Sequence, residues 1–141
     1  MKKLFILLVM AACIFSVQAQ ESSEPLFVLF GANSSDLGDV SAEQAIANSR
    51  VFAQVAQILL DNPSLRVLVD GHANAVLRTA AEERDTLLPL SLERAQAAAD
   101  FLVKFFNIDV RRIVVSHAGG EFPGQSATSN RRVNFFLIPP R

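Results

Sequence analysis

The chain has 141 residues, with 13 Lys or Arg and 14 Asp or Glu, so its net charge at neutral pH is close to −1. This balance, together with the lack of any basic stripe, excludes a nucleic-acid binder that relies on phosphate contacts. The length is that of one domain with a substantial hydrophobic core.

The N-terminal residues have the pattern of a secretory signal. A basic pair at residues 2–3 precedes an apolar run at residues 4–12, and the small residue Ala19 offers a cleavage site. We therefore expect residues 1–19 to form a signal peptide and residues 20–25 a mobile polar leader. The apolar run is too short and too poorly flanked for a membrane span, so we expect no integral span in the mature chain.

Cys13 is the only cysteine in the sequence and leaves two alternatives open. We favour the interpretation that it is discarded with the signal peptide. Because the small residues Ala11 and Ala12 precede it, Cys13 is alternatively the lipid-modified first residue of a lipoprotein. Met10 and the apolar residues 14–17 are atypical of such a site. Both alternatives predict an exported protein.

Hydrophobic patterning predicts a strand and then a helix in the first half of the chain. An apolar run at residues 26–30, bounded by a proline and a glycine, predicts a buried strand. A polar loop follows at residues 32–40. Ser41, with Gln44 three residues later, predicts a capping box at the start of a helix, which ends before Pro63. The buried face of this helix is predicted to carry Ile46, Phe52, Val55, Ile58 and Leu59.

The second half of the chain predicts three more strands and one more helix. β-Branched residues and a terminal glycine favour a strand over residues 65–71. Ser91 follows a proline and is predicted to be the N-cap of the second helix. Two further strands are predicted at residues 113–116 and 133–138. The second helix is predicted to bury Ala95, Ala98, Ala99, Leu102, Phe105 and Phe106.

This order, β-α-β-α-β-β, predicts an α+β fold. We expect a mixed four-stranded sheet with the two main helices packed on one face. The second and third strands are joined by a helical crossover, so we expect them to be parallel neighbours or near-neighbours with a right-handed connection.

Two short motifs lie in the last third of the sequence. Residues 90–95 read Leu-Ser-Leu-Glu-Arg-Ala, and residues 130–133 read Asn-Arg-Arg-Val. In these motifs the chain resembles the OmpA-like domain, which binds peptidoglycan in bacterial envelopes. Where that family carries Gly-His-Thr-Asp, residues 71–74 read Gly-His-Ala-Asn. The resemblance extends over nearly all of the predicted elements, and we assign residues 26–141 to one OmpA-like domain.

The resemblance implies a pocket for the diaminopimelate side chain of peptidoglycan, which carries an ammonium and a carboxylate. It implies that Arg94 binds the carboxylate through its planar fork and that Arg131 lines the same pocket. Asn33 matches the polar residue after the family's first strand. Asn74 replaces the family's Asp, and its neutral amide accepts a hydrogen bond without neutralising the ammonium. Losing that charge-assisted bond costs roughly 1.5–3 kcal/mol, so we expect weakened binding.

The segment between Asn74 and Arg94 is longer than the resemblance leads us to expect. It contains three acidic residues, Glu82, Glu83 and Asp85. One of them is a candidate to replace the missing carboxylate. We favour the alternative that they form a solvated turn of charge.

The leading hypothesis is a non-catalytic cell-envelope domain, periplasmic or associated with the outer membrane, that docks on peptidoglycan. The alternative is a structural or adaptor domain that has lost this ligand and binds an envelope protein, which Asn74 and the long segment favour. We predict no enzyme, because no acid–base pair or activated nucleophile emerges. His72 and His117 are far apart and have no metal-ligand spacing, so we predict neither metal nor cofactor.

Overall fold

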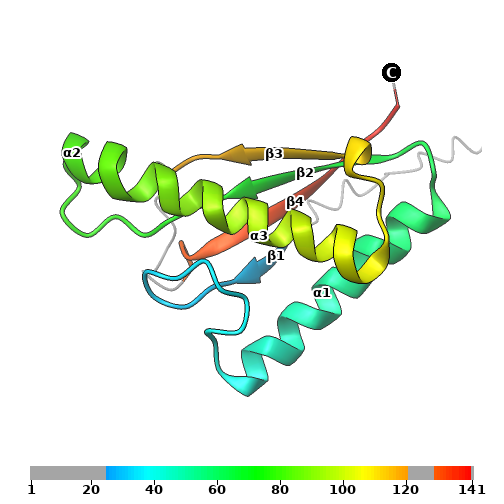
Figure 1. Ribbon diagram of the computed structural model, residues 1–141, viewed down its shortest axis with the longest axis horizontal. Coiled ribbons are helices and arrows are strands. Elements are labelled where there is room, and N and C mark those ends of the chain that lie inside the picture. The colour runs from blue at the N-terminus through cyan, green and yellow to red at the C-terminus, as the bar shows by residue number, and fades with distance from the viewer. Residues whose placement is uncertain (1–24, 121–128, 141) are drawn as a thin grey trace, which may run out of the picture.

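The computed structural model describes residues 25–120 and 129–140. The signal peptide, the leader up to Glu24 and the lipidation alternative at Cys13 lie outside the described residues, and they stay predictions. Within the described residues the predicted element order is confirmed (Figure 1). The elements are β1 (Leu26–Leu29), α1 (Ala42–Asp61), β2 (Arg66–Gly71), α2 (Ala80–Glu82), the π-helix η1 (Glu83–Leu87), α3 (Leu88–Phe106), the 3₁₀-helix η2 (Val110–Arg112), β3 (Ile113–His117) and β4 (Arg132–Ile138).

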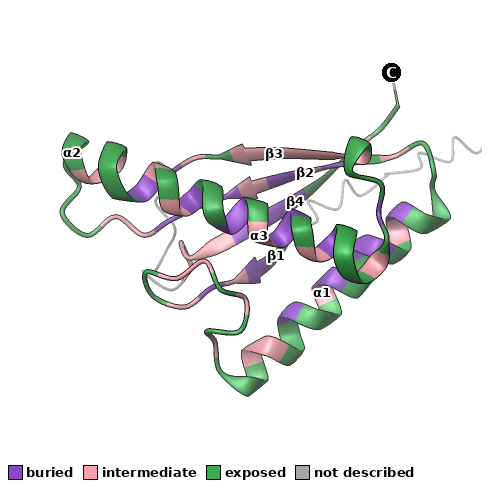
Figure 2. Cartoon of the chain, in the orientation of Figure 1, coloured by how far each residue is buried: buried purple, intermediate pink, exposed green. Residues whose placement is uncertain are grey.

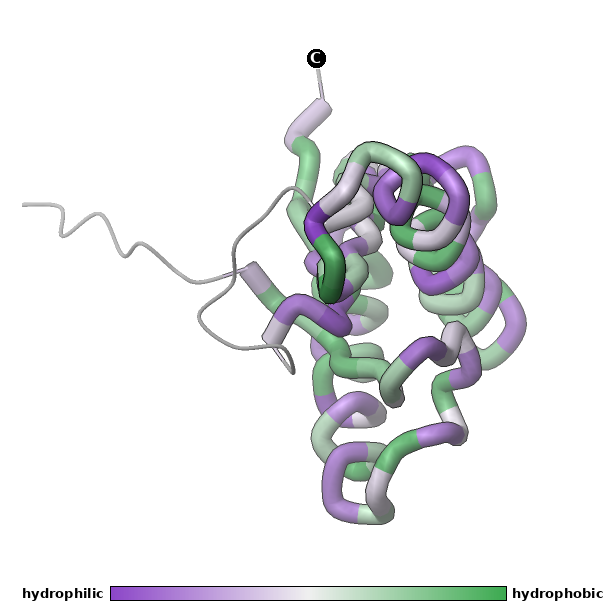
Figure 3. Tube along the Cα trace, turned by 90° about the vertical axis from the view of Figure 1, so that its left-hand side faces the viewer, coloured by the Kyte–Doolittle hydropathy of each residue, from purple (hydrophilic) through white to green (hydrophobic). Residues whose placement is uncertain are grey.

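The four strands form one mixed sheet in the order β1-β4-β2-β3. β2 and β3 are parallel neighbours, as predicted, and β4 lies between β1 and β2 and is antiparallel to both. Figure 3 views the molecule after a quarter turn and shows α1 and α3 together on one side of the sheet. The predicted α+β architecture is therefore confirmed.

The core lies between this sheet and the two long helices (Figure 2). Two predicted core residues are wrong, because Ile46 is 55% exposed and Phe105 is 62% exposed. Ile46 lies six residues before the buried Phe52, which places the two side chains about 120° apart around a helix. Phe105 lies on the flank of the stripe that contains Leu102, and its ring packs on Phe101. The buried cluster comprises Val28, Phe30, Phe52, Val55, Ala56, Leu59, Val67, Val69, Ala95, Ala98, Leu102, Ile108, Val133 and Phe135.

The start of α1 confirms half of the predicted capping box. The backbone N–H of Gln44 donates to the Ser41 hydroxyl over 3.1 Å. The Gln44 side-chain amide donates to Asn48, one turn further along the helix, over 3.0 Å. The serine therefore caps the helix, while the glutamine positions Asn48.

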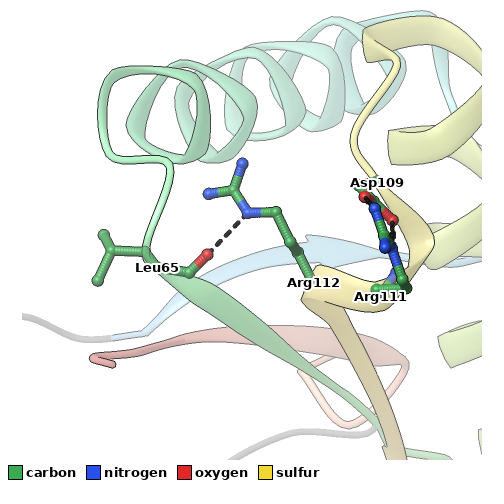
Figure 4. A network of polar contacts seen from close by, with 4 residues as sticks. All are labelled: Leu65, Asp109, Arg111 and Arg112. Atoms are coloured by element: carbon green, nitrogen blue, oxygen red, sulfur yellow. Dashed lines mark hydrogen bonds and ion pairs between the residues drawn. The ribbon is translucent and has the colours of Figure 1, made fainter. Parts of the chain in front are cut away.

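Arg112 caps the C-terminal end of α1 (Figure 4). Its Nε donates to the carbonyl of Leu65 over 2.8 Å, and its Nη2 donates to the carbonyls of Leu59 and Asn62 over 2.7 and 2.8 Å. The last carbonyls of a helix lack intrahelical donors, so a guanidinium at this position satisfies them. Arg112 thereby ties α1 to the start of β2.

The second long helix begins much earlier than predicted. The N-cap is Thr79, whose hydroxyl accepts from the N–H of Glu82, and the chain is helical through α2, η1 and α3. The prediction of Ser91 as N-cap is wrong, because Ser91 is fully buried inside α3. Proline normally marks a first turn because it lacks an N–H. Here the wide π turn, closed by Leu88 N–H to the carbonyl of Glu83, immediately precedes Pro89. Because the helix is widened by this π turn, it continues past Pro89 instead of beginning there.

Candidate functional site

Three segments meet at one end of the sheet because of the strand directions. The ends of β1 and β2 lie beside the start of the antiparallel β4 (Figure 1). Two backbone bonds fix the junction. Phe30 N–H donates to the carbonyl of Arg131 over 2.7 Å, and His72 N–H donates to the carbonyl of Arg132 over 2.9 Å. The loop with Asn33, the loop with Asn74 and the side chain of Arg131 therefore emerge at the same end.

Arg94 lies beneath this junction and is only 1% exposed. Its Nε donates to the carbonyl of Ser34 over 2.8 Å. Its Nη2 and Nη1 donate to the carbonyls of Gly31 and His72, each over 3.0 Å. One side chain of α3 thus holds the loop after β1 against the loop after β2.

Among the described residues, the charge of Arg94 has no acidic counterpart. Burial, and then the positive charge of nearby Arg131, lower the pKa of Arg94 to about 10, so it stays protonated at neutral pH. Within residues 25–120 and 129–140 no ion pair includes Arg94. The ring of Phe30 lies 5.6 Å from the guanidinium carbon. Electrostatic interactions are stronger where water is excluded, so the charge of Arg94 acts strongly on groups at this end of the sheet.

Asn33 lies on the exposed tip of the loop that Arg94 holds. Its φ of 50° is left-handed, a conformation that Asn adopts more readily than most residues. The carbonyls of Gly31 and Ser34, on either side of it, both accept from Arg94. The buried arginine therefore fixes the segment from which Asn33 projects.

Asn74 and Arg131 are both half-buried. In the described part of the chain, neither side chain makes a hydrogen bond or an ion pair. The structure brings all four predicted residues to one junction, with Arg94 below and the other three nearer the surface; that they bind a ligand stays a prediction.

The three acidic residues of the long segment all have partners within the protein, either backbone N–H groups or a neighbouring arginine. The Glu82 carboxylate accepts from the N–H groups of Val76, Leu77 and Arg78 over 2.8, 2.7 and 2.6 Å. Desolvation acts to raise the pKa of Glu82, but these backbone bonds outweigh it and lower the pKa. The predicted solvated turn is therefore wrong for Glu82, which organises the loop before α2.

Glu83 and Asp85 also differ from one another. Both oxygens of Glu83 lie 3.1 Å from the backbone nitrogen of Gly120, so this residue ties the loop after β3 to η1. Asp85 is exposed and pairs with its neighbour Arg84 over 2.7 Å. Glu83 precedes Arg94 by eleven residues, which is about 16 Å along a helix. Glu82 nevertheless bonds to Val76, two residues after Asn74, and Glu83 bonds to Gly120, whose backbone lies against Ala75. Both carboxylates are therefore engaged with backbone N–H groups close to the Asn74 loop.

A polar cluster that the sequence did not predict lies beside the junction. The Nε2 atom of His72 lies 3.0 Å from the carboxylate of Asp70 and 3.1 Å from the amide nitrogen of Asn134. The hydrogen bond from His72 is the largest of the effects that lower the pKa of Asp70. The sequence does contain a signal for this cluster, because the polar residues Asp70 and Asn134 interrupt two otherwise apolar strands. These residues are direct partners in the β2–β4 register.

Two further features bear on function. Across residues 25–120 and 129–140, no cluster of three or more His, Cys, Asp or Glu side chains is arranged to hold a metal ion. No helix in those residues combines the length and apolarity that a bilayer crossing requires.

Solved structures with the same fold come from several bacterial proteins. The peptidoglycan-associated lipoprotein of Burkholderia pseudomallei matches with a TM-score of 0.62 and 21% identity, over 82% of this chain and 91% of that one. The OmpA-like domain of FopA1 from Francisella tularensis matches with a TM-score of 0.63 and 22% identity, over 82% and 72%. The C-terminal domain of Helicobacter pylori MotB matches with a TM-score of 0.58 and 16% identity, over 84% and 87%. These TM-scores show a shared fold, and at such low identity the likeness extends to the fold alone.

The sequence itself identifies the family. No curated protein sequence matches the chain significantly. The model of the OmpA family, however, matches residues 29–134, which extend from the end of β1 to the middle of β4 and include the whole junction. The chain therefore belongs to the OmpA family.

Proposed function

We propose that this chain is a non-catalytic cell-envelope domain that docks on peptidoglycan through the junction of β1, β2 and β4. Membership of the OmpA family supports this, and one structural relative is named a peptidoglycan-associated lipoprotein. The observation that carries the proposal is the buried guanidinium of Arg94. It lies near a second cation, Arg131, and no carboxylate pairs with it among the described residues.

The ligand is the zwitterionic end of a diaminopimelate side chain. The resemblance implied that the fork of Arg94 binds the ligand carboxylate, but that fork is engaged with three loop carbonyls. The carboxylate therefore pairs with Arg131, whose planar fork suits a bidentate contact. Arg94 adds its charge from below while its N–H groups stay on the loop carbonyls. The amide oxygen of Asn74 accepts from the ammonium, and Asn33 offers a second amide at the surface. Because Asn74 is neutral, this site binds more weakly than one that carries a carboxylate.

The decisive experiment is co-sedimentation of the exported protein with purified sacculi. Arg131→Ala should abolish sedimentation, since it removes the half-exposed cation without touching the buried one. Arg66→Ala is the matched control, because Arg66 is exposed and lies at the opposite end of the sheet, at the start of β2. If Arg131→Ala sediments as well as the parent does, the pocket is wrongly assigned.

The second candidate function is an adaptor that binds an envelope protein. Two adjacent apolar side chains, Val76 and Leu77, are each 72% exposed on the loop that Glu82 organises. Together with the loss of the acidic residue at position 74, this favours a protein contact. A parent protein that fails to sediment with sacculi at low salt would favour the adaptor over the peptidoglycan ligand.

The proposal includes export to the periplasm, with residues 1–19 removed as a signal peptide and the domain beginning near residue 26. Intact-mass measurement of the protein from the soluble periplasm and from membranes tests it. A species that begins at Gln20 supports the soluble form. A species that begins at Cys13 with added acyl mass would show instead that the domain is a lipid-anchored tether.

A further inference from the structure

We propose that the free edge of β1, with the groove beside it, is a docking site for an extended peptide of a partner protein in which apolar residues flank an acidic one. This site lies apart from the ligand junction and does not depend on the function proposed above. Three independent features of β1 and its surroundings support it.

The first feature is a strand edge with unpaired backbone groups. β1 is the outermost strand of the sheet. Phe30 exchanges a backbone bond with Arg131, and bonded pairs alternate along an antiparallel ladder, so Leu26 and Val28 also bond to β4. The N–H and C=O of Phe27 therefore point away from β4. Among the described residues, neither group has a hydrogen-bond partner. Such an edge is a template for another strand.

The second feature is a side chain that makes the backbone hydrogen bonds which a neighbouring strand would otherwise make at this edge. At Leu29, the other residue of β1 whose backbone points outward, the N–H donates to Asn48 Oδ1 over 3.0 Å. The Asn48 amide nitrogen donates back to the Leu29 carbonyl over 2.8 Å. These are the two bonds that a neighbouring strand would make. Pro25 has no N–H, so the open edge comprises the carbonyl of Pro25 and both groups of Phe27.

The third feature is an apolar groove of about 440 Å³ along this edge, between β1 and α1. It is lined by Pro25, Leu26, Phe27, Leu29, Gln44, Ala47, Asn48 and Val51. A peptide added to a sheet edge gains affinity from main-chain bonds and specificity from pockets for alternate side chains. The groove supplies those pockets on the side of α1.

The charge beside the groove selects the central residue of the peptide. The guanidinium carbon of Arg132 lies 5.8 Å from the centre of the Phe27 ring. In residues 25–120 and 129–140, no carboxylate forms an ion pair with Arg132. A residue paired directly with Phe27 presents its side chain on the same face of the sheet. An acidic residue there meets Arg132, and its neighbours point to the other face, towards Ala47 and Val51.

A second copy of this chain fits the edge poorly. Antiparallel pairing centred on Phe27 would oppose Pro25 of one copy to Leu29 of the other. Asn48 already occupies the outward groups of Leu29 in each copy, so a dimer would meet this obstacle at both ends of the pairing and a peptide at only one end. Such a dimer would also bring the two Arg132 guanidinium groups to the same face, and like charges repel. The edge is therefore suited to a different chain.

The test uses two capped peptides, acetyl-Thr-Val-Glu-Val-Thr-amide and its Gln counterpart, titrated into the ¹⁵N-labelled exported protein. We expect the Glu peptide to shift the amide signal of Phe27 and to bind at least tenfold more tightly than the Gln peptide. Arg132→Gln should remove that preference. Ala47→Trp should fill the groove and weaken binding at least tenfold. The matched control Ala53→Trp, on an exposed part of α1 outside the groove, should not.

Several results would overturn the proposal. One is the absence of saturable binding at millimolar peptide, and another is equal binding by the Ala47→Trp and Ala53→Trp variants. Signals that shift at Asn33 and Asn74 instead of Phe27 would show that the peptide carboxylate occupies the ligand junction. A parent protein that dimerises through β1 would show that the edge is occupied by a second copy. Failure of sacculus binding leaves these expectations unchanged, so the two proposals are separable.

Discussion

Replacing Arg94 by methionine tests whether this side chain holds the junction together. Methionine keeps the apolar stem and approximate length of arginine but has no N–H groups. The carbonyls of Gly31, Ser34 and His72 would each lose the donor that they have in the parent. The loop after β1 would then have no side-chain link to α3 through this position.

The expected loss follows from two opposing effects. A hydrogen bond to a charged group contributes about 1.5–3 kcal/mol, so three of them contribute about 5–9 kcal/mol. The pKa of Arg94, lowered from 12.5 to about 10, indicates that its buried charge is less favourable than a solvated one by about 3 kcal/mol. The net stabilisation is then about 2–6 kcal/mol. Because the freed carbonyls regain water at the surface, we expect about 2–3 kcal/mol for Arg94→Met.

Urea unfolding followed by circular dichroism measures this loss as a lower midpoint with an unchanged slope. The matched control is Arg66→Met, which removes an exposed cation and should change the free energy of unfolding by less than about 0.5 kcal/mol. If Arg94→Met also stays within about 0.5 kcal/mol of the parent, its three bonds do not hold the loops and the reasoning fails.

Three further predictions concern the ligand, the backbone and acid stability. Asn74→Asp should tighten binding of a diaminopimelate muropeptide roughly tenfold by calorimetry, and unchanged affinity would exclude an ammonium beside this residue. Gly119→Ala should destabilise the fold by about 1–3 kcal/mol in thermal unfolding, because φ is +55° and a Cβ would collide with Glu83; Gly38→Ala, whose Cβ would meet only the exposed Asp36 side chain at 3.3 Å, is the control. The lowered pKa of Asp70 contributes stability that is fully present above its unfolded value near 3.8 and is lost as pH falls through the folded value. Asp70→Asn should therefore flatten the stability profile at the acid end, and an identical profile would contradict the assignment.

The fold was predictable because apolar periodicity and strand ends are local properties of the sequence. The apolar run before Gly31 and the terminal glycine at residue 71 define strand ends without reference to the rest of the chain. The start of the second helix was not predictable in this way. Pro89 is compatible with either a first turn or a widened turn, and the pattern around it does not distinguish them. Whether the helix begins at Pro89 or continues through it depends on contacts of the preceding segment, such as that of Glu83 with Gly120.

The site shows the same division between local and distant information. Asn33, Asn74 and Arg131 converge because each lies beside the end of a strand, and the strand order then decides their proximity. The burial of Arg94 was not predicted. Its acceptors at Gly31 and Ser34 are 63 and 60 residues away in the sequence. Motif matching singled out Arg94, but the acceptors of its N–H groups are visible only in three dimensions.

The bonds of Arg112 have a consequence for how the protein folds. Its acceptors at Leu65 and Leu59 precede it by 47 and 53 residues, so the last turn of α1 is completed only when η2 reaches it. Contacts between such distant residues slow folding, because a long loop must close before they form. The end of α1 and the start of β2 should therefore open as one cooperative unit. Their backbone amides should exchange with deuterium at a common rate, distinct from that of the N-terminal turns of α1.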